Sequence, residues 1–131
     1  MIHIKLTVKG EQDTAPFRHT FFHADESDEK LFYNSVNMIK EKLDKNLKIN
    51  INESLVIYCA YVIDNLRANE TISAIERDAQ KILPPDKVMI GVPESLRKIV
   101  FEVKIDKLPK RCVILKEPIT ISNYILAAKD C

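Results

Sequence analysis

The chain has 131 residues, enough for one domain with its own core and too few for two. Its 46% hydrophobic and 30% charged residues are typical of a globular protein and exclude a disordered one. The 20 basic and 19 acidic residues almost cancel, which excludes a strongly basic nucleic-acid binder on overall composition. No run of about 18 apolar residues is present, and the alternating N-terminus is unlike a signal peptide. We therefore expect a cytoplasmic protein that does not span a membrane.

Scarce glycines and scattered cysteines exclude several site types. Gly10 and Gly91 are the only glycines, whereas phosphate-binding P-loops and dinucleotide fingerprints need several. Cys59, Cys112 and Cys131 are odd in number, far apart and without a CxxC motif, so we expect neither a disulfide framework nor a zinc site.

The N-terminal residues 2–8 alternate between apolar and polar side chains, which predicts a half-buried strand. Its apolar side carries Ile2, Ile4, Leu6 and Val8. Residues 9–24 show no clear period and are predicted to be a connection.

A first helix is predicted to begin in the acidic run and to end near Asn46, a residue that tolerates the left-handed conformation. The acidic run contains Asp25, Glu26, Asp28 and Glu29, and the apolar stripe contains Phe32, Val36, Ile39 and Leu43.

A second helix is predicted to follow the capping box formed by Asn50 and Glu53 and to run to about Ala68. Its wide apolar surface predicts the central, most buried helix. Its less apolar side carries Ser54, Tyr58, Tyr61 and Asn65, and Asn69 is a second left-handed stop.

A third helix is predicted over residues 71–83, capped by Thr71 and ended by Pro84-Pro85. A short helix over about 85–89 is predicted to stop at Gly91, which should have positive φ. Pro93 is predicted to prevent a simple continuation.

Strands over residues 99–105 and 111–115, joined by a turn over 106–110, predict a β-hairpin near the C-terminus. The fold class is α+β: a small helical bundle of three main helices plus a short one, followed by the hairpin. We expect the N-terminal strand to pair with this hairpin, because its apolar side needs a surface to cover.

No pattern assembles a catalytic or metal site. His19 and His23 have a spacing that places two imidazoles on one helix face, but no acidic or cysteine partner has matching spacing. The acidic run is interpreted as a solvated helix start, and Cys59 as a small core residue.

Two interaction hypotheses remain open. Tyr58 and Tyr61 suit a protein–protein interface, where aromatic residues are enriched, or each packs locally with a wet hydroxyl group. Three helices followed by a hairpin also describe a winged-helix DNA-binding domain. That alternative is weakened because the helix over 71–83 has no excess of positive charge.

The segment 88–94 reads VMIGVPE, and Pro118-Ile119 follows the second strand of the predicted hairpin. With these motifs, residues 25–119 resemble the urease gamma subunit family, in which a VMxGVPE-like block is the most specific match and Pro-Ile closes the usual end. The residues that carry the resemblance are Asn50, Glu53, Arg67, Thr71, Val88, Met89, Gly91, Val92, Pro93, Glu94, Pro118 and Ile119. Within a single domain of residues 1–131, residues 1–20 are an N-terminal extension and 120–131 a C-terminal tail.

The resemblance implies a non-catalytic structural subunit of a nickel-dependent enzyme that hydrolyses urea. It implies alpha and beta subunits as partners, typically as a trimer of alpha-beta-gamma units, and places the nickel ions and catalytic residues in the alpha subunit. No catalytic, cofactor-binding or metal-binding residue is then expected in this chain, and neither is a nucleic-acid or membrane partner.

Overall fold

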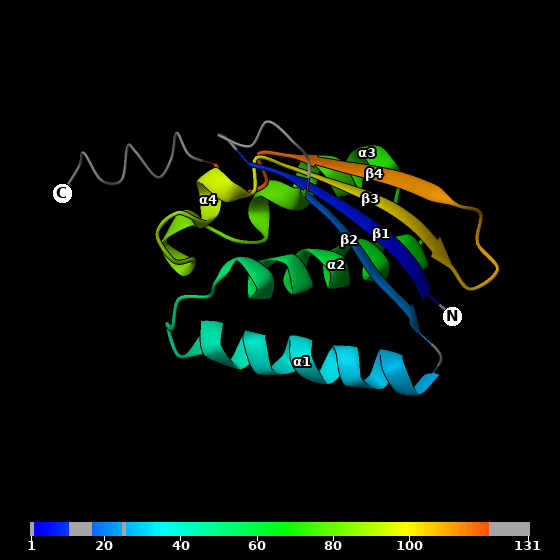
Figure 1. Ribbon diagram of the computed structural model, residues 1–131, viewed down its shortest axis with the longest axis horizontal. Coiled ribbons are helices and arrows are strands. Elements are labelled where there is room, and N and C mark those ends of the chain that lie inside the picture. The colour runs from blue at the N-terminus through cyan, green and yellow to red at the C-terminus, as the bar shows by residue number, and fades with distance from the viewer. Residues whose placement is uncertain (1, 11–16, 25, 121–131) are drawn as a thin grey trace.

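A computed structural model describes residues 2–10, 17–24 and 26–120 of the chain. Its sheet has four antiparallel strands in the order β2-β1-β3-β4 (Figure 1). The N-terminal alternation forms β1 (Ile2–Lys9), which pairs along its whole length with β3 (Lys98–Ile105). β3 and β4 (Arg111–Lys116) form the predicted hairpin. The expected pairing of the N-terminal strand with the hairpin is therefore confirmed.

The segment predicted as a connection contains a strand that the sequence pattern did not reveal. β2 (Phe17–Ala24) pairs antiparallel with β1 and forms one edge of the sheet. The pairing register shifts between Ile4 and Lys5, so the two strands do not keep one continuous phase. Such an irregularity interrupts period-two alternation, which is the signal by which a strand is recognised in a sequence.

The two long helices follow the predicted boundaries closely. α1 (Glu26–Asp44) is followed by Asn46 with φ 60°, and α2 (Ile51–Arg67) by Asn69 with φ 60°. Both asparagines are therefore the predicted left-handed stops. The capping box is present: the Glu53 N–H donates to Asn50 Oδ1 at 2.8 Å, and the Asn50 N–H donates to Glu53 Oε1 at 3.1 Å.

The segment after α2 is more broken than predicted. α3 (Ile72–Asp78) continues only as a 3₁₀ turn over Ala79–Lys81, and a second 3₁₀ turn covers Pro85–Lys87. Gly91 has the predicted positive φ, 93°, but it begins α4 (Val92–Ser95) rather than ending a helix. Pro93 lies in the first turn of α4, where a helix does not need the N–H that proline lacks, and the turn over Pro85–Lys87 does not continue through it.

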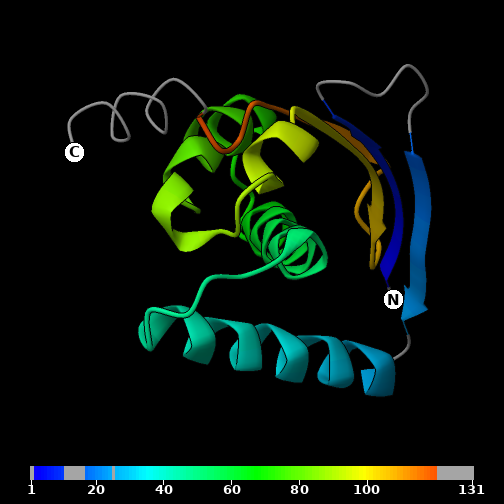
Figure 2. The ribbon, with the colours of Figure 1, turned by 60° about the vertical axis from the view of Figure 1, so that its left-hand side comes forward.

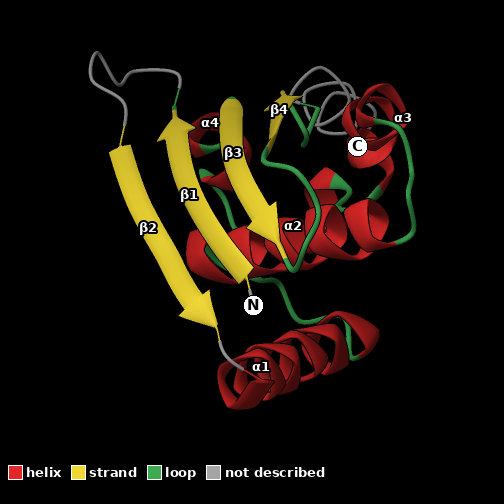
Figure 3. Ribbon diagram, turned by 90° about the vertical axis from the view of Figure 1, so that its right-hand side faces the viewer, coloured by secondary structure: helices red, strands yellow, loops and turns green. Residues whose placement is uncertain are grey.

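The helices lie on one face of the curved sheet, with α2 against that face and α1 along the side of α2 (Figures 2 and 3). The inward sides of β1 and β3, the core of α2 and the Val36 and Ile39 side chains of α1 form one buried cluster. None of the described helices combines the length and the apolar character needed to cross a membrane.

Candidate functional site

The α1–α2 connection with the start of α2 and the turn before α4 lie at the same end of the molecule (Figure 1), and both segments carry exposed apolar side chains. Ile90 is 87% exposed, Leu47 52% and Met89 45%, and Ile51 at the start of α2 is partly exposed. We call Leu47, Ile51, Met89 and Ile90 the apolar end patch. Groups of large apolar side chains that are exposed to solvent are typical of protein contact surfaces.

Backbone pairing between distant segments holds the patch together. Ile49 and Val88 form an isolated parallel bridge and are both buried. The Ile49 N–H donates to the Lys87 carbonyl at 3.1 Å, and the Met89 N–H donates to the Ile49 carbonyl at 2.9 Å. The bridge thus anchors buried Ile49, which lies between Leu47 and Ile51, against buried Val88, which directly precedes Met89.

Gly91 shapes the outer rim of the patch. Its left-handed φ turns the chain from the bridge into α4, where the Val92 N–H donates to the Met89 carbonyl at 3.2 Å. A shallow groove follows this turn and is lined by Asn50, Ile51, Asn52, Met89, Ile90 and Val92. The patch is therefore a shaped surface on a tightly hydrogen-bonded frame.

A second exposed apolar surface lies on the outer side of α1. Leu31 and Met38 are both about two-thirds exposed, at 65% and 68%. Beside Met38, the Lys42 ammonium pairs with the Glu53 carboxylate at 2.7 Å and so links α1 to the start of α2. This surface is a second candidate contact region, separate from the apolar end patch.

The structure corrects the interface hypothesis for Tyr58 and leaves it open for Tyr61. Tyr58 is fully buried in the core of this chain, because α2 is covered by the sheet on one side and by other helices elsewhere. It therefore has no exposed surface to lose on assembly. Tyr61 is half-buried, and its hydroxyl group donates to the Ile75 carbonyl at 2.7 Å, which ties α2 to α3.

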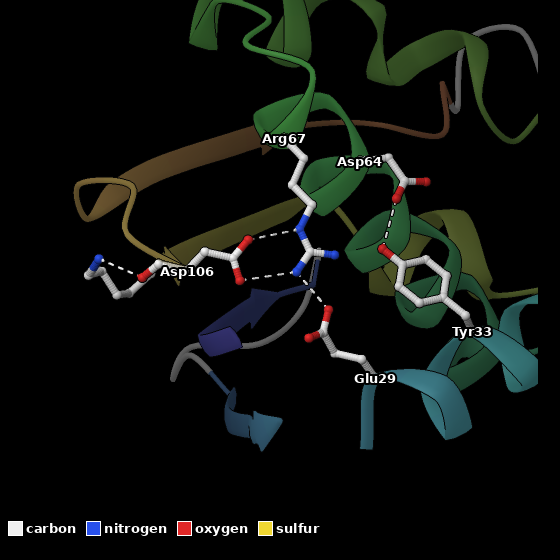
Figure 4. Close-up of polar contacts among 6 residues, drawn as sticks. Glu29, Tyr33, Asp64, Arg67 and Asp106 are labelled. Atoms are coloured by element: carbon white, nitrogen blue, oxygen red, sulfur yellow. Dashed lines mark hydrogen bonds and ion pairs between the residues drawn. The ribbon is translucent and has the colours of Figure 1, made fainter. Parts of the chain in front are cut away.

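Arg67 connects three parts of the fold (Figure 4). Its guanidinium group lies 2.6 Å from Glu29 on α1 and 3.4 Å from Asp106 in the turn between β3 and β4. Next to it, the Tyr33 hydroxyl donates to Asp64 Oδ1 at 2.8 Å. Burial, followed by this hydrogen bond to a carboxylate, raises the pKa of Tyr33 well above 10.0. These contacts fasten α1 to α2 and to the hairpin turn.

Most other residues of the family-like motifs support the backbone. Thr71 caps α3 by accepting the Ala74 N–H at 3.1 Å, and Asn50 with Glu53 caps α2. Val88, Val92, Pro93, Pro118 and Ile119 are buried. Glu94 is half-buried, and its Oε2 has no hydrogen-bond partner among the described residues. Met89 is thus the exposed apolar side chain of the motif set.

The sequence interpretation missed three members of the apolar end patch: Leu47, Ile51 and Ile90. Ile90 lies in the VMxGVPE-like block, next to the glycine with positive φ. An apolar pair in a tight turn was the available signal, since turns are normally on the surface.

The described residues offer no metal centre. Within residues 2–10, 17–24 and 26–120, no group of three or more His, Cys, Asp or Glu residues could hold a metal ion. His19 and His23 lie in β2 rather than on a helix, so the helix-face spacing does not apply to them. Cys59 is a buried core residue as predicted, and burial raises the pKa of its thiol well above 9.0.

The fold and the surface together define a small α+β protein with its most exposed apolar side chains at one end and on α1. The sequence profile of the family described as "Urease, gamma subunit" matches residues 21–119. The urease subunit gamma of Halalkalibacterium halodurans is 34% identical over 92 residues, which cover 70% of this chain and 91% of that protein. The urease subunit gamma of Laribacter hongkongensis is 30% identical over 77 residues, 59% of this chain and 77% of that protein. The chain belongs to the urease gamma subunit family.

Proposed function

We propose that this chain is a structural gamma subunit of a nickel-dependent urease, an enzyme that hydrolyses urea to ammonia and carbamate. The match to the family over residues 21–119 carries this proposal. In the proposed assembly the chain joins alpha and beta subunits in the cytoplasm, as three alpha-beta-gamma units. This proposal is preferred to the winged-helix alternative, which rested only on the order of the elements.

The role proposed for the chain is to bind the other urease subunits and not to react with urea. Urea hydrolysis by a metal requires an activated water molecule held by imidazole and carboxylate ligands. The described residues of this chain do not fit a nickel ion, because they bring no such ligand group together. In this proposal the nickel ions and the catalytic residues belong to the alpha subunit, as the resemblance to the family implies.

The apolar end patch supports an assembly role. Its side chains are apolar, exposed and mounted on a hydrogen-bonded frame, so a partner can cover them without a large rearrangement. Lys45 and Lys48 are exposed in the same connection and provide a polar rim. We propose this patch as the contact with another urease subunit.

Co-expression tests the proposal. The chain, carrying an affinity tag, is produced alone and together with the alpha and beta subunits encoded in the same genome, and each sample is analysed by size-exclusion chromatography and a urease assay. We expect co-elution of the three chains, with urea hydrolysis in the nickel-loaded complex and none by this chain alone. Turnover by the isolated chain would contradict the non-catalytic role. Specific DNA binding without capture of the other subunits would favour the winged-helix alternative.

A further inference from the structure

The strand β1 lies outside the part of the chain that the family match covers, yet it lies in the middle of the sheet. The match begins at residue 21, within β2. The H. halodurans relative has little sequence beyond its aligned 92 residues, which make up 91% of its length. The strand that separates β2 from β3 therefore lies outside the matched region.

β1 covers an edge that would otherwise be open. Without it, β3 would present unpaired backbone groups along Lys98–Ile105, and such an edge accepts a further strand. The apolar side of β1 also forms part of the core, because Ile2 and Leu6 are completely buried and Ile4 and Val8 nearly so. An occupant of this edge must therefore supply both hydrogen bonds and apolar side chains.

The pairing specifies which extended segment fits. The inward pairs are Ile2 with Ile105, Ile4 with Val103, Leu6 with Phe101 and Val8 with Ile99. On the outward side, the Lys5 ammonium lies 3.8 Å from the Glu102 carboxylate opposite it. At the end of the strand, the Arg97 N–H donates to the Lys9 carbonyl at 3.1 Å. A slip of one residue would turn the four apolar side chains outward, so the phase of the alternation selects the occupant.

We propose that the β3 edge is an acceptor site for an antiparallel strand with apolar residues at alternate positions, and that residues 2–9 of this chain fill it from within. The filled site closes this edge to strands of other chains and lets the sheet fold without a partner. The inference concerns the chain itself and does not depend on its assembly into a urease.

A cut-and-exchange experiment tests the acceptor site in the folded protein. A protease site is placed between Glu11 and Pro16, the chain is folded and then cut, and a fluorescent peptide of residues 1–10 is added. We expect the cut N-terminal piece to remain bound during size-exclusion chromatography and to exchange with the labelled peptide. Two peptides form the matched comparison. Leu6→Asp places a charge in the core and should weaken binding at least about tenfold, while Lys5→Asp places it outside and should weaken binding much less.

A second measurement avoids dependence on the cut. In the uncut chain, Leu6→Asp should lower Tm by more than about 5 °C and allow the labelled wild-type peptide to bind, while Lys5→Asp should leave the edge closed. The proposal is overturned if the cut piece is lost while the rest keeps its Tm and its monomeric state. It is also overturned if the Leu6→Asp and Lys5→Asp peptides bind equally well, or if neither uncut variant differs from wild type.

Discussion

Three residues with positive φ, Asn46, Asn69 and Gly91, terminate or redirect helices in this chain. Asparagine reaches the left-handed region at modest cost because its short polar side chain makes local hydrogen bonds, and glycine reaches it because it has no Cβ. Asp106 and Glu117 also have positive φ, at 50° and 44°, in the turns that flank β4. Their residue types gave weaker signals, so the sequence did not single them out.

Gly91→Val should lower the free energy of unfolding by more than about 1 kcal/mol. The cost comes from backbone strain and not from crowding, because no described neighbour lies within 4 Å of the position a Cβ would take. Gly91→Asn is the matched control and should cost less, since asparagine tolerates positive φ. Urea denaturation of the three proteins measures the difference, and equal midpoints for glycine and valine would contradict the assignment.

Tyr58→Phe should leave the free energy of unfolding unchanged or slightly raised. The buried Tyr58 hydroxyl has no hydrogen-bond partner among the described residues, so its removal ends a desolvation penalty without breaking a bond. Tyr61→Phe removes the hydrogen bond to Ile75 and should cost about 1 kcal/mol. Thermal unfolding of both variants makes the comparison. A larger loss for Tyr58→Phe than for Tyr61→Phe would be the wrong order.

Tyr58 also makes the stability of the folded chain depend on pH in the alkaline range. Burial raises the pKa of Tyr58 above its ordinary 10.0, so the folded chain holds this proton more tightly than the unfolded chain does. Below pH 10 the Tyr58 hydroxyl is protonated in both states and the free energy of unfolding is unaffected. As the pH rises from 10 toward the folded pKa, deprotonation favours the unfolded chain and the free energy of unfolding falls. Tyr58→Phe has no such proton, so its free energy of unfolding should fall less than that of wild type between about pH 10 and 11.

At the scale of elements, α2 is the helix on which the rest of the structure packs, and its start is closed by side chains. Asn50 and Glu53 satisfy each other's backbone N–H groups, and Lys42 on α1 pairs with the second Glu53 oxygen. The Lys42 hydrogen bond holds the pKa of Glu53 below its ordinary 4.5, with a further contribution from the Asn50 N–H. One carboxylate therefore both caps a helix and connects two helices.

Asn50→Ala should lower the free energy of unfolding by about 1 kcal/mol, because an orphan N–H at the start of α2 loses its acceptor. Asn52→Ala changes the exposed residue directly before Glu53 and is the control, which should have little effect.

The pKa of Glu53 is depressed in the fold, so the ionised carboxylate stabilises the folded chain above pH 4.5, and this stabilisation is lost as the pH falls below 4.5. Glu53→Gln should therefore show a shallower loss of stability between about pH 5 and 3 in urea denaturation.

Arg67→Ala should destabilise the chain by about 1 kcal/mol, since the contacts of Arg67 join α1, α2 and the hairpin turn. Arg77→Ala is the matched control, because Arg77 is well exposed and pairs with its neighbour Asp78. It should leave the unfolding midpoint unchanged. The effect at Arg67 should shrink in high salt, as screening weakens partly exposed ion pairs. Equal midpoints for the two alanine variants would show that the three-way contact contributes nothing.

At the scale of the whole molecule, the large exposed apolar side chains among residues with described burial divide into two surfaces, the apolar end patch and the outer side of α1. The patch depends on the bridge between Ile49 and Val88, which brings together two loops far apart in the chain. The α1 surface depends on the helix alone. The two surfaces can therefore be altered separately without disturbing the core.

If the proposed assembly forms, Ile90→Asp should weaken association with the alpha and beta subunits at least about tenfold while leaving Tm of the isolated chain unchanged. Met38→Asp places the same charge on the exposed outer side of α1 and should leave association intact. Co-purification and thermal unfolding of both variants make the test. If Met38→Asp loses association and Ile90→Asp does not, the contact lies on α1 and not on the apolar end patch.

The sequence by itself determined the features that depend on neighbours a few residues apart. The alternation in β1 and β3, the capping box at Asn50, the Thr71 cap and the positive φ of Gly91 all follow from local periodicity or local hydrogen bonds. Only the tertiary structure decided that residues 17–24 form a strand, that Tyr58 is enclosed, and that the Ile49–Val88 bridge joins the segments that carry Leu47 and Ile90. These outcomes depend on which distant segment covers each surface. When the alternation of a strand is interrupted, only its pairing with neighbouring strands shows that it is a strand. A tyrosine on a helix is exposed or buried according to which distant segment packs against it.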